Sequence, residues 1–236
     1  MDKSKVTAIV LAAGKGKRMN SSLAKQFLML HQRPILYYSL KAFEESSVDE
    51  IVLVTGEDQV VYCRENIVKQ YKIGKVSQII VGGSERYDSV YKALLAVEKS
   101  DYVLIHDGAR PFISKDLIEN VILQVKTHRA CILGTPVKET IKVINTDGYI
   151  AASPDRSTLW NAQTPQAFEY ETIKKAYTIF NQDKDRDRNK MTDDAMIYET
   201  YLNQPVKMLL GDYRNIKITT PEDLAIAEAL IDDLLC

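Results

Sequence analysis

Short runs of apolar residues alternate with amphipathic segments along the first half of the chain. Five of the runs have the length of strands, and several are apolar throughout rather than alternating: residues 6–11, 51–54, 79–81, 102–105 and 130–133. Parallel strands that are covered on both faces have this pattern. Helix-like segments stand between them at 35–43, 60–71, 89–97 and 117–126. This β-α-β-α order predicts an α/β fold with a doubly wound, mostly parallel, Rossmann-like sheet.

The pattern changes after Pro136. Residues 140–144 and 149–152 are predicted as two strands, joined by the hairpin turn sequence Asn-Thr-Asp-Gly. A hairpin of this kind has no place in a parallel sheet, so we expect residues 137–162 to project as a β-arm from a single domain spanning residues 1–236. Its apolar residues need a partner surface, and a second copy of the chain is the simplest one.

The last part of the chain adds a loop, two strands and a helix. The mixed-charge run 183–190 is typical of a solvated loop, and residues 206–210 and 216–218 are predicted as strands. The final helix has a clear start: Thr220 suits the N-cap, Pro221 suits the first helical position, and two acidic residues follow at the positive end of the dipole.

Composition bounds the class of protein. The 236 residues are 45% hydrophobic and 27% charged, an ordinary globular balance that one α/β domain can accommodate. The chain has 31 Lys and Arg and 32 Asp and Glu, which gives a net charge of -1. No overall positive field is therefore expected to attract nucleic acid or an anionic membrane. Any anion site must therefore be a local concentration of charge.

Cysteine usage and hydropathy point to a cytoplasmic protein. The three cysteines, at 63, 131 and 236, are an odd number without a C-x-x-C pair, which argues against a disulfide framework or a cysteine-rich zinc site. The first apolar run is too short for a signal peptide, and no stretch is long enough to span a bilayer.

A glycine loop with a high density of cations follows the first predicted strand. In the sequence LAAGKGKRM (11–19), Gly14 and Gly16 allow a tight turn that brings backbone N–H groups up to a phosphate. The nearby cations are Lys15, Lys17, Arg18 and Lys25. The loop matches neither the Rossmann fingerprint nor the Walker A motif. It favours a polyphosphate site at the carboxyl end of a strand, and an exposed basic loop is the alternative.

A second polar cluster, HDGARP (106–111), follows the predicted strand 102–105. Asp107 is the candidate carboxylate for Mg²⁺, which binds through one or two carboxylates and substrate phosphates. Arg110 either contacts substrate or forms a structural ion pair with Asp107, and the ion pair is favoured. His106 is interpreted either as a packing residue or as a support behind the site residues, and no nucleophile triad is present in the pattern.

Three further segments carry hydrogen-bonding groups: 82–86, 155–166 and 215–219. The glycines of the first can approach a base or ribose. In the third, Lys217 lies within an apolar run, so it is either directed at a phosphate or an exposed edge residue.

Taken together, the chain resembles the 2-C-methyl-D-erythritol 4-phosphate cytidylyltransferase family of the non-mevalonate isoprenoid pathway, from Val6 to about Ala229. The matching segments stand in the family's order: LAAGKGKRM, KQFL, GGSERYDSV, HDGARPF, TIK, LWNAQTPQAF, TDDA and NIKITTPEDLAIAE. The resemblance implies a nucleotidyltransferase that moves CMP from CTP to 2-C-methyl-D-erythritol 4-phosphate, releasing pyrophosphate. It also implies Mg²⁺ or another divalent cation, and a homodimer with an exchanged arm.

The resemblance also assigns residues. Arg18 and Lys25 would stabilise the transition state, and Asp107 would lie near the metal. The implied CTP contacts are Ala12, Ala13, Gly14, Gly16, Lys17, Gly83, Ser84, Ser89, Asp107, Gly108 and Lys217. The implied contacts of the acceptor phosphate are Thr140, Arg156, Thr164, Thr192 and Arg110, the first two reaching it from the arm of the other subunit.

Two positions depart from the family pattern. Ala24 stands where a proline usually precedes the Lys-Gln pair, so the loop that carries Lys25 is expected to be less rigid. Gly108 stands where the family often has alanine and is expected to permit close approach of a ligand.

Three other functions compete. A ribitol-5-phosphate cytidylyltransferase would share the fold and the mechanism, and the run 159–162 and the doublet 193–194 favour the methylerythritol enzymes over it. A nucleotide-sugar synthase using another base fits the glycine loop but not residues 163–166. A CTP-binding regulator without catalysis is disfavoured by the presence of Arg18, Lys25 and Asp107.

Overall fold

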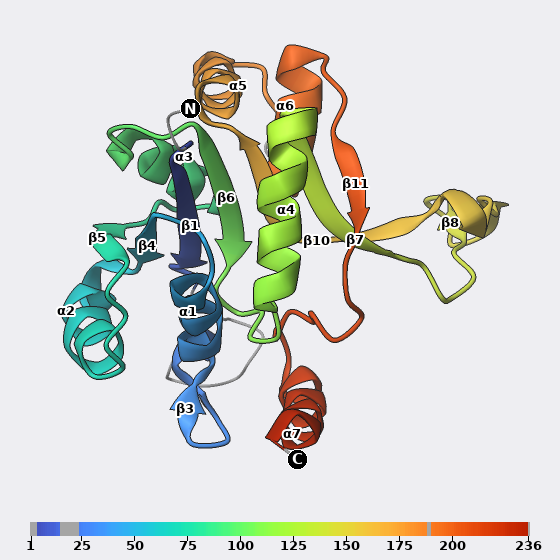
Figure 1. Cartoon of the computed structure of the whole chain (residues 1–236). Coiled ribbons are helices and arrows are strands. Elements are labelled where there is room, and N and C mark those ends of the chain that lie inside the picture. The colour runs from blue at the N-terminus through green and yellow to red at the C-terminus, as the bar shows by residue number, and fades with distance from the viewer. Residues whose placement is uncertain (1–3, 15–23, 188–189, 236) are drawn as a thin grey trace.

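The protein is built on a seven-stranded sheet with the strand order β11-β7-β10-β6-β1-β4-β5 (Figure 1). The computed structural model describes residues 4–14, 24–187 and 190–235, the last four of them as backbone only. The strands are β1 (Val6–Ala12), β4 (Glu50–Thr55), β5 (Val76–Val81), β6 (Tyr102–Asp107), β7 (Ala130–Pro136), β10 (Trp160–Glu169) and β11 (Lys207–Leu210). All neighbouring pairs are parallel except those of β10, which runs antiparallel to β6 and β7. The predicted α/β fold and mostly parallel sheet are confirmed.

Helices cover both faces of the sheet. They are α1 (Ile35–Glu45), α2 (Val60–Tyr62), which continues as a π-helix (Cys63–Lys69), α3 (Arg86–Ala96), α4 (Lys115–His128), α5 (Tyr170–Gln182), α6 (Asp194–Leu202) and α7 (Pro221–Leu235). One core contains α1 and α4 with Ala8 and Val10 of β1, and the other contains α3, α5 and α6 with Ile9. Successive side chains of a strand point to opposite faces, so burial on both faces explains why β1 is apolar throughout.

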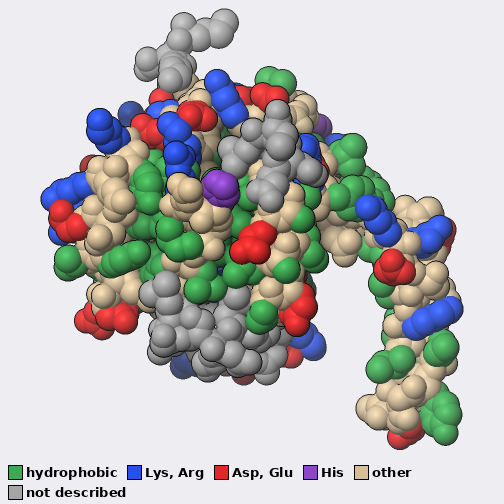
Figure 2. Space-filling model, turned by 90° about the horizontal axis from the view of Figure 1, so that it is seen from below, with side chains coloured by type: hydrophobic (Ala, Val, Ile, Leu, Met, Phe, Trp, Pro, Cys, Tyr) green, Lys and Arg blue, Asp and Glu red, His purple; other side chains and the backbone are tan. Residues whose placement is uncertain are grey.

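The hairpin predicted in the middle of the chain forms an arm that stands away from the body (Figures 1 and 2). Its strands, β8 (Val143–Ile144) and β9 (Ile150–Ala152), are shorter than predicted. Apolar side chains of the arm face outward; Tyr149 is 74% exposed and Ile150 64%. A single 3-10 turn, Arg156–Thr158, leads back to β10.

The sequence patterns give no indication of β10, because its first half is rich in polar residues and resembles a loop. The helices α5 and α6 are likewise not predicted. The strand expected at residues 216–218 is wrong: this segment is irregular, and the Ile218 N–H donates to the Ala109 carbonyl at 2.9 Å.

The terminal helix begins as predicted. The Asp223 N–H donates to Thr220 Oγ1 at 3.4 Å, and α7 starts at Pro221. Its buried face packs on Leu30 and Ile35, near the small hairpin of β2 (Met29–Leu30) and β3 (Arg33–Pro34). In the described part of the chain, no helix is long and apolar enough to cross a membrane.

Candidate active site

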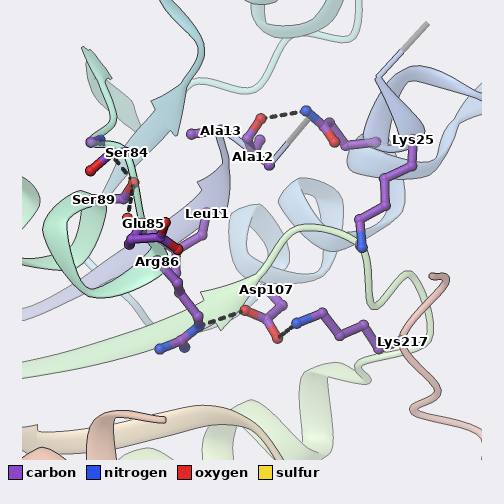
Figure 3. A pocket seen from close by; sticks show the side chains of 14 residues that line it. Leu11, Ala12, Ala13, Lys25, Ser84, Glu85, Arg86, Ser89, Asp107 and Lys217 are labelled. Carbon is purple, nitrogen blue, oxygen red and sulfur yellow. Dashed lines mark hydrogen bonds and ion pairs between the residues drawn. The ribbon is translucent and has the colours of Figure 1, made fainter. Parts of the chain in front are cut away.

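The carboxyl ends of β1 and β6 and the start of α3 meet at one edge of the sheet, which is where open α/β folds bind ligands. A pocket of about 620 Å³ lies there (Figure 3). Its lining is Leu11, Ala12, Ala13, Gly14, Lys25, Gln26, Gly83, Ser84, Glu85, Arg86, Ser89, Asp107, Ala109 and Lys217. The pocket therefore gathers the ends of segments that are far apart in the sequence.

The described start of the glycine loop follows β1 into the pocket. Ala12, Ala13 and Gly14, three of the residues for which CTP contacts are predicted, line it. Gly16, Lys17 and Arg18 lie outside the described residues.

Lys25 reaches the pocket from a short 3-10 turn, Lys25–Phe27. The next residue, Gln26, is 2% exposed, and its Nε2 donates to the Ala12 carbonyl at 2.5 Å. This bond ties the Lys25 turn to the end of β1. Ala24 has φ of -61°, the value that a proline ring imposes, so the backbone here already has the geometry of the usual family residue.

Asp107, at the end of β6, is the centre of a cluster of cations. Its Oδ1 lies 3.2 Å from Arg86 Nε, and its Oδ2 lies 2.8 Å from Lys217 Nζ and 3.8 Å from Arg110 Nε. Burial alone would raise the pKa of Asp107, but Arg86, Lys217 and Arg110 together hold it well below its usual range. The carboxylate is therefore ionised throughout the physiological range.

Arg110 and Lys217 differ in their relation to the pocket. Arg110 does not line it; its Nη1 donates to the Asn215 carbonyl at 2.7 Å, and its side chain is 12% exposed. This placement favours the structural ion pair over direct contact with substrate. Lys217 does line the pocket, with its side chain 35% exposed, and stands on an irregular segment rather than a sheet edge.

The turn between β5 and α3 forms the opposite wall. Ser89 Oγ accepts from the Gly83 N–H at 2.9 Å and donates to the Glu85 carbonyl at 3.1 Å, while Ser84 Oγ donates to Asp88 at 2.7 Å. A Cβ on Gly83 would come within 2.3 Å of the Asp88 Cβ, so this tight turn requires glycine. The predicted residues Gly83, Ser84 and Ser89 all line the pocket.

Thr164 supports the site from behind. It is 4% exposed, its Oγ1 accepts from the Asp107 N–H at 3.1 Å, and it lies 3.1 Å from His106 Nδ1. Burial lowers the pKa of His106 to about 3, so the imidazole is neutral, in agreement with a packing role. The structure thus places Thr164 beneath Asp107 rather than in the pocket lining.

Gly108 does not line the pocket either. A Cβ there would come within 2.8 Å of Leu36 Cδ1 and 3.0 Å of the Leu11 carbonyl. The space left by the missing side chain is therefore filled by α1 and β1. Gly108 allows these elements to pack closely and does not give a ligand the close approach that was expected.

Three residues assigned to the acceptor phosphate are not among the residues that line the pocket. Thr140 and Arg156 are on the arm, where Arg156 borders a separate hollow of about 400 Å³ next to Trp160. The Thr192 hydroxyl lies 3.2 Å from Met196 Sδ. Within the described residues, none of the three forms a hydrogen bond or ion pair with Asp107.

The role of Arg86 in the site is not indicated by local patterns. Arg86 lines the pocket and contacts both Asp107 and the fully buried Asp194. The segment Gly82 to Arg86 stands out in the sequence for its glycines, and nothing in it shows that its arginine meets a carboxylate 108 positions away.

A doubly wound sheet with glycine turns, a carboxylate and lysines at its carboxyl edge defines the nucleotidyltransferase type of α/β protein. The model of the 2-C-methyl-D-erythritol 4-phosphate cytidylyltransferase family matches residues 6–233. A curated relative of that name from Lachnoclostridium phytofermentans is 50% identical over 227 residues, 96% of each chain, and one from Lachnospira eligens is 48% identical over 94% of this chain and 96% of its own.

Solved structures agree with the sequence relatives. The 4-diphosphocytidyl-2C-methyl-D-erythritol synthase of Anaerococcus prevotii superposes with a TM-score of 0.85 at 32% identity, covering 97% of this chain and 96% of its own. The chain belongs to the 2-C-methyl-D-erythritol 4-phosphate cytidylyltransferase family.

Proposed function

We infer that the protein transfers CMP from CTP to 2-C-methyl-D-erythritol 4-phosphate, giving 4-diphosphocytidyl-2-C-methyl-D-erythritol and pyrophosphate. The observation that carries this inference is the pocket at the sheet edge, where Asp107, Lys217 and Lys25 meet the backbone of the two glycine turns. Family membership over residues 6–233 supplies the substrates. The ribitol-5-phosphate alternative is not favoured, because the relatives described above carry the methylerythritol name.

The reaction requires positioning and positive charge rather than a general base. A phosphate monoester has a second pKa of about 6, so the acceptor phosphate is largely ionised at pH 7 and can attack the α-phosphorus of CTP in line. Lys25 and Lys217 are suited to stabilise the charge that develops as pyrophosphate leaves, and Arg18 is proposed for the same role from the glycine loop.

A divalent cation, Mg²⁺ or a similar ion, is proposed at Asp107. Within the described residues there is no group of three or more acidic, His or Cys side chains that could hold a metal as a cage. A single ionised carboxylate facing a phosphate pocket fits the other usual mode, in which Mg²⁺ takes one or two protein carboxylates and completes its shell with phosphate oxygens and water. Bound there, the ion would neutralise charge on the triphosphate.

A homodimer is proposed to complete the acceptor site. The exposed apolar arm needs a covering surface, and Thr140 and Arg156 would then reach the pocket of the partner subunit. A mixture of Arg156→Ala chains with Lys25→Ala chains tests this, because each heterodimer would hold one intact site. Recovered activity is expected; inactive heterodimers of verified composition would refute the shared site.

Cytoplasmic localisation is also proposed. Cys63 and Cys131 are both free and buried, as suits a reducing compartment. Fractionation of cells with an antibody to the protein would test it.

The deciding experiment measures pyrophosphate release from CTP with Mg²⁺, with methylerythritol phosphate and ribitol 5-phosphate side by side. A preference for methylerythritol phosphate is expected. A preference for ribitol phosphate would move the protein to the alternative acceptor. CTP binding without release for either acceptor would favour a regulator.

A further inference from the structure

The Arg86 guanidinium connects the pocket to the interior of the protein. Arg86 is the first residue of α3, and its Nε lies 3.2 Å from Asp107 Oδ1 (Figure 3). Its two terminal nitrogens donate to the two oxygens of Asp194, at 2.9 and 2.7 Å. This is the bidentate geometry that arginine forms with a carboxylate, and it fixes the guanidinium plane.

Asp194 is itself held rigidly. It is 0% exposed, and the Tyr177 hydroxyl donates to its Oδ1 at 2.5 Å. The backbone N–H groups of Asp194 and Ala195 both donate to Gln166 Oε1 at 3.0 Å. Side chains from β10, α5 and α6 therefore determine where Arg86 stands.

The two oxygens of Asp107 have different partners. Arg86 holds Oδ1, and Lys217 holds Oδ2 at 2.8 Å. A carboxylate bound only through Oδ2 could rotate about its Cβ–Cγ bond, whereas donors on both oxygens restrict that rotation. Asp194 accepts one N–H from each terminal nitrogen of Arg86, and the single N–H of Nε is directed at Asp107, so the guanidinium links the buried carboxylate to Asp107.

We propose that Arg86, clamped by Asp194 and Tyr177, is a positioning residue that sets the orientation of the Asp107 carboxylate for nucleotidyl transfer. The inference rests on the proposed function, since it names a residue that acts on the same site. The competing explanation is that the Arg86–Asp194 pair only fastens α3 to α6, with no effect on the chemistry.

The test uses the full-length enzyme with CTP, methylerythritol phosphate and Mg²⁺. Turnover by the wild-type enzyme is measured first. A wild-type enzyme without activity would refute the proposed function, and only an active wild type allows the role of Arg86 to be tested. Arg86→Lys keeps the positive charge but lacks the planar fork that holds both oxygens of Asp194 while Nε donates to Asp107. Displacing a reacting group by about 1 Å can cost on the order of 10²-fold, so kcat should fall roughly 10- to 100-fold, with KM for CTP within about threefold of wild type.

Two further variants separate positioning from fastening. Arg129→Lys alters the exposed Arg129–Glu169 pair, which has an N–O distance of 2.6 Å, and should leave kcat unchanged. Tyr177→Phe removes one hydrogen bond to Asp194 and leaves Arg86 intact, so it should lower kcat by about two- to tenfold. This variant can still test the proposal if Arg86→Lys does not fold.

A double-mutant cycle with Asp107→Asn gives the sharpest readout, using single turnovers with enzyme in excess. If Arg86 acts through Asp107, then Arg86→Lys costs less than about threefold more in the Asp107→Asn background. The proposal is refuted if Arg86→Lys lowers the rate by the same factor in the Asp107→Asn background as in the wild type. It is also refuted by a folded Arg86→Lys or Tyr177→Phe enzyme with wild-type kcat, or by a loss of activity that matches the loss of folded protein.

Discussion

Replacing Lys217 by methionine should remove one cation from the pocket and leave the fold intact. The Lys217 side chain is 35% exposed, and its Nζ lies 2.8 Å from Asp107 Oδ2. Asp107 keeps Arg86 on Oδ1 in the variant, so its carboxylate stays ionised. The Asp107 side chain is only 10% exposed but keeps Arg86 and Arg110 as partners, so losing the hydrogen bond from Lys217 should cost about 1–3 kcal/mol of stability and lower the melting temperature by roughly 2–10 °C.

Catalysis should be impaired as well. A unit charge about 4 Å from a phosphate oxygen contributes about 4 kcal/mol at an effective dielectric constant of about 20. Two effects reduce this value: water screens the exposed third of the side chain, and only the charge that develops in the transition state contributes to catalysis. The stabilisation of the transition state by Lys217 is then about 2–3 kcal/mol. Lys217→Met should therefore lower kcat/KM roughly 30- to 150-fold.

The assay is pyrophosphate release at saturating and at limiting CTP. Lys217→Arg keeps the charge and should retain more activity than Lys217→Met. Lys207→Met, on an exposed position of β11, is the matched control and should behave as wild type. A folded Lys217→Met enzyme with kcat/KM within threefold of wild type would refute the reasoning.

Three other substitutions test the loop, the buried histidine and the arm. Ala24→Pro suits the local φ of -61° and should raise the free energy of unfolding by about 0.4–1 kcal/mol in urea melts, so a lower value would contradict the reading of this turn. Because burial lowers the pKa of His106 to about 3, the unfolded chain binds a proton as the pH falls below about 6.5 and the folded chain does not. The free energy of unfolding should therefore fall by about 2 kcal/mol from pH 7.5 to 5 on account of this residue, and denaturant melts of His106→Gln should lack that part of the slope. Ile144 on the arm is 64% exposed, and Ile144→Asp should convert the proposed dimer to a monomer in light scattering. Leu123→Asp on α4, at a residue that is 62% exposed, is the control and should leave the dimer intact. If both variants remain dimeric, the arm is not the interface.

Several parts of the protein can be predicted from local periodicity alone. Continuous apolar runs predict the parallel strands, because a strand covered by helices on both faces carries apolar side chains on both faces. The glycine loop and Asp107 were recognisable because the end of a strand is a fixed place in this class of fold, where ligands bind. The arm was recognisable because its turn sequence interrupts the α/β alternation.

How distant segments of the chain meet depends on the folded structure. β10 enters the sheet antiparallel between β6 and β7, and its polar first half gives no strand pattern because it leads out to the arm. Arg86 meets Asp194 from 108 positions away, and Lys217 reaches Asp107 from an irregular segment that hydrogen bonds to Ala109 and Thr164 fix in place. Such pairings depend on strand order and on long-range hydrogen bonds, which local spacing does not encode. Local patterns therefore locate the edge of the sheet where a ligand is expected, whereas the charges that face each other there emerge only from the folded chain.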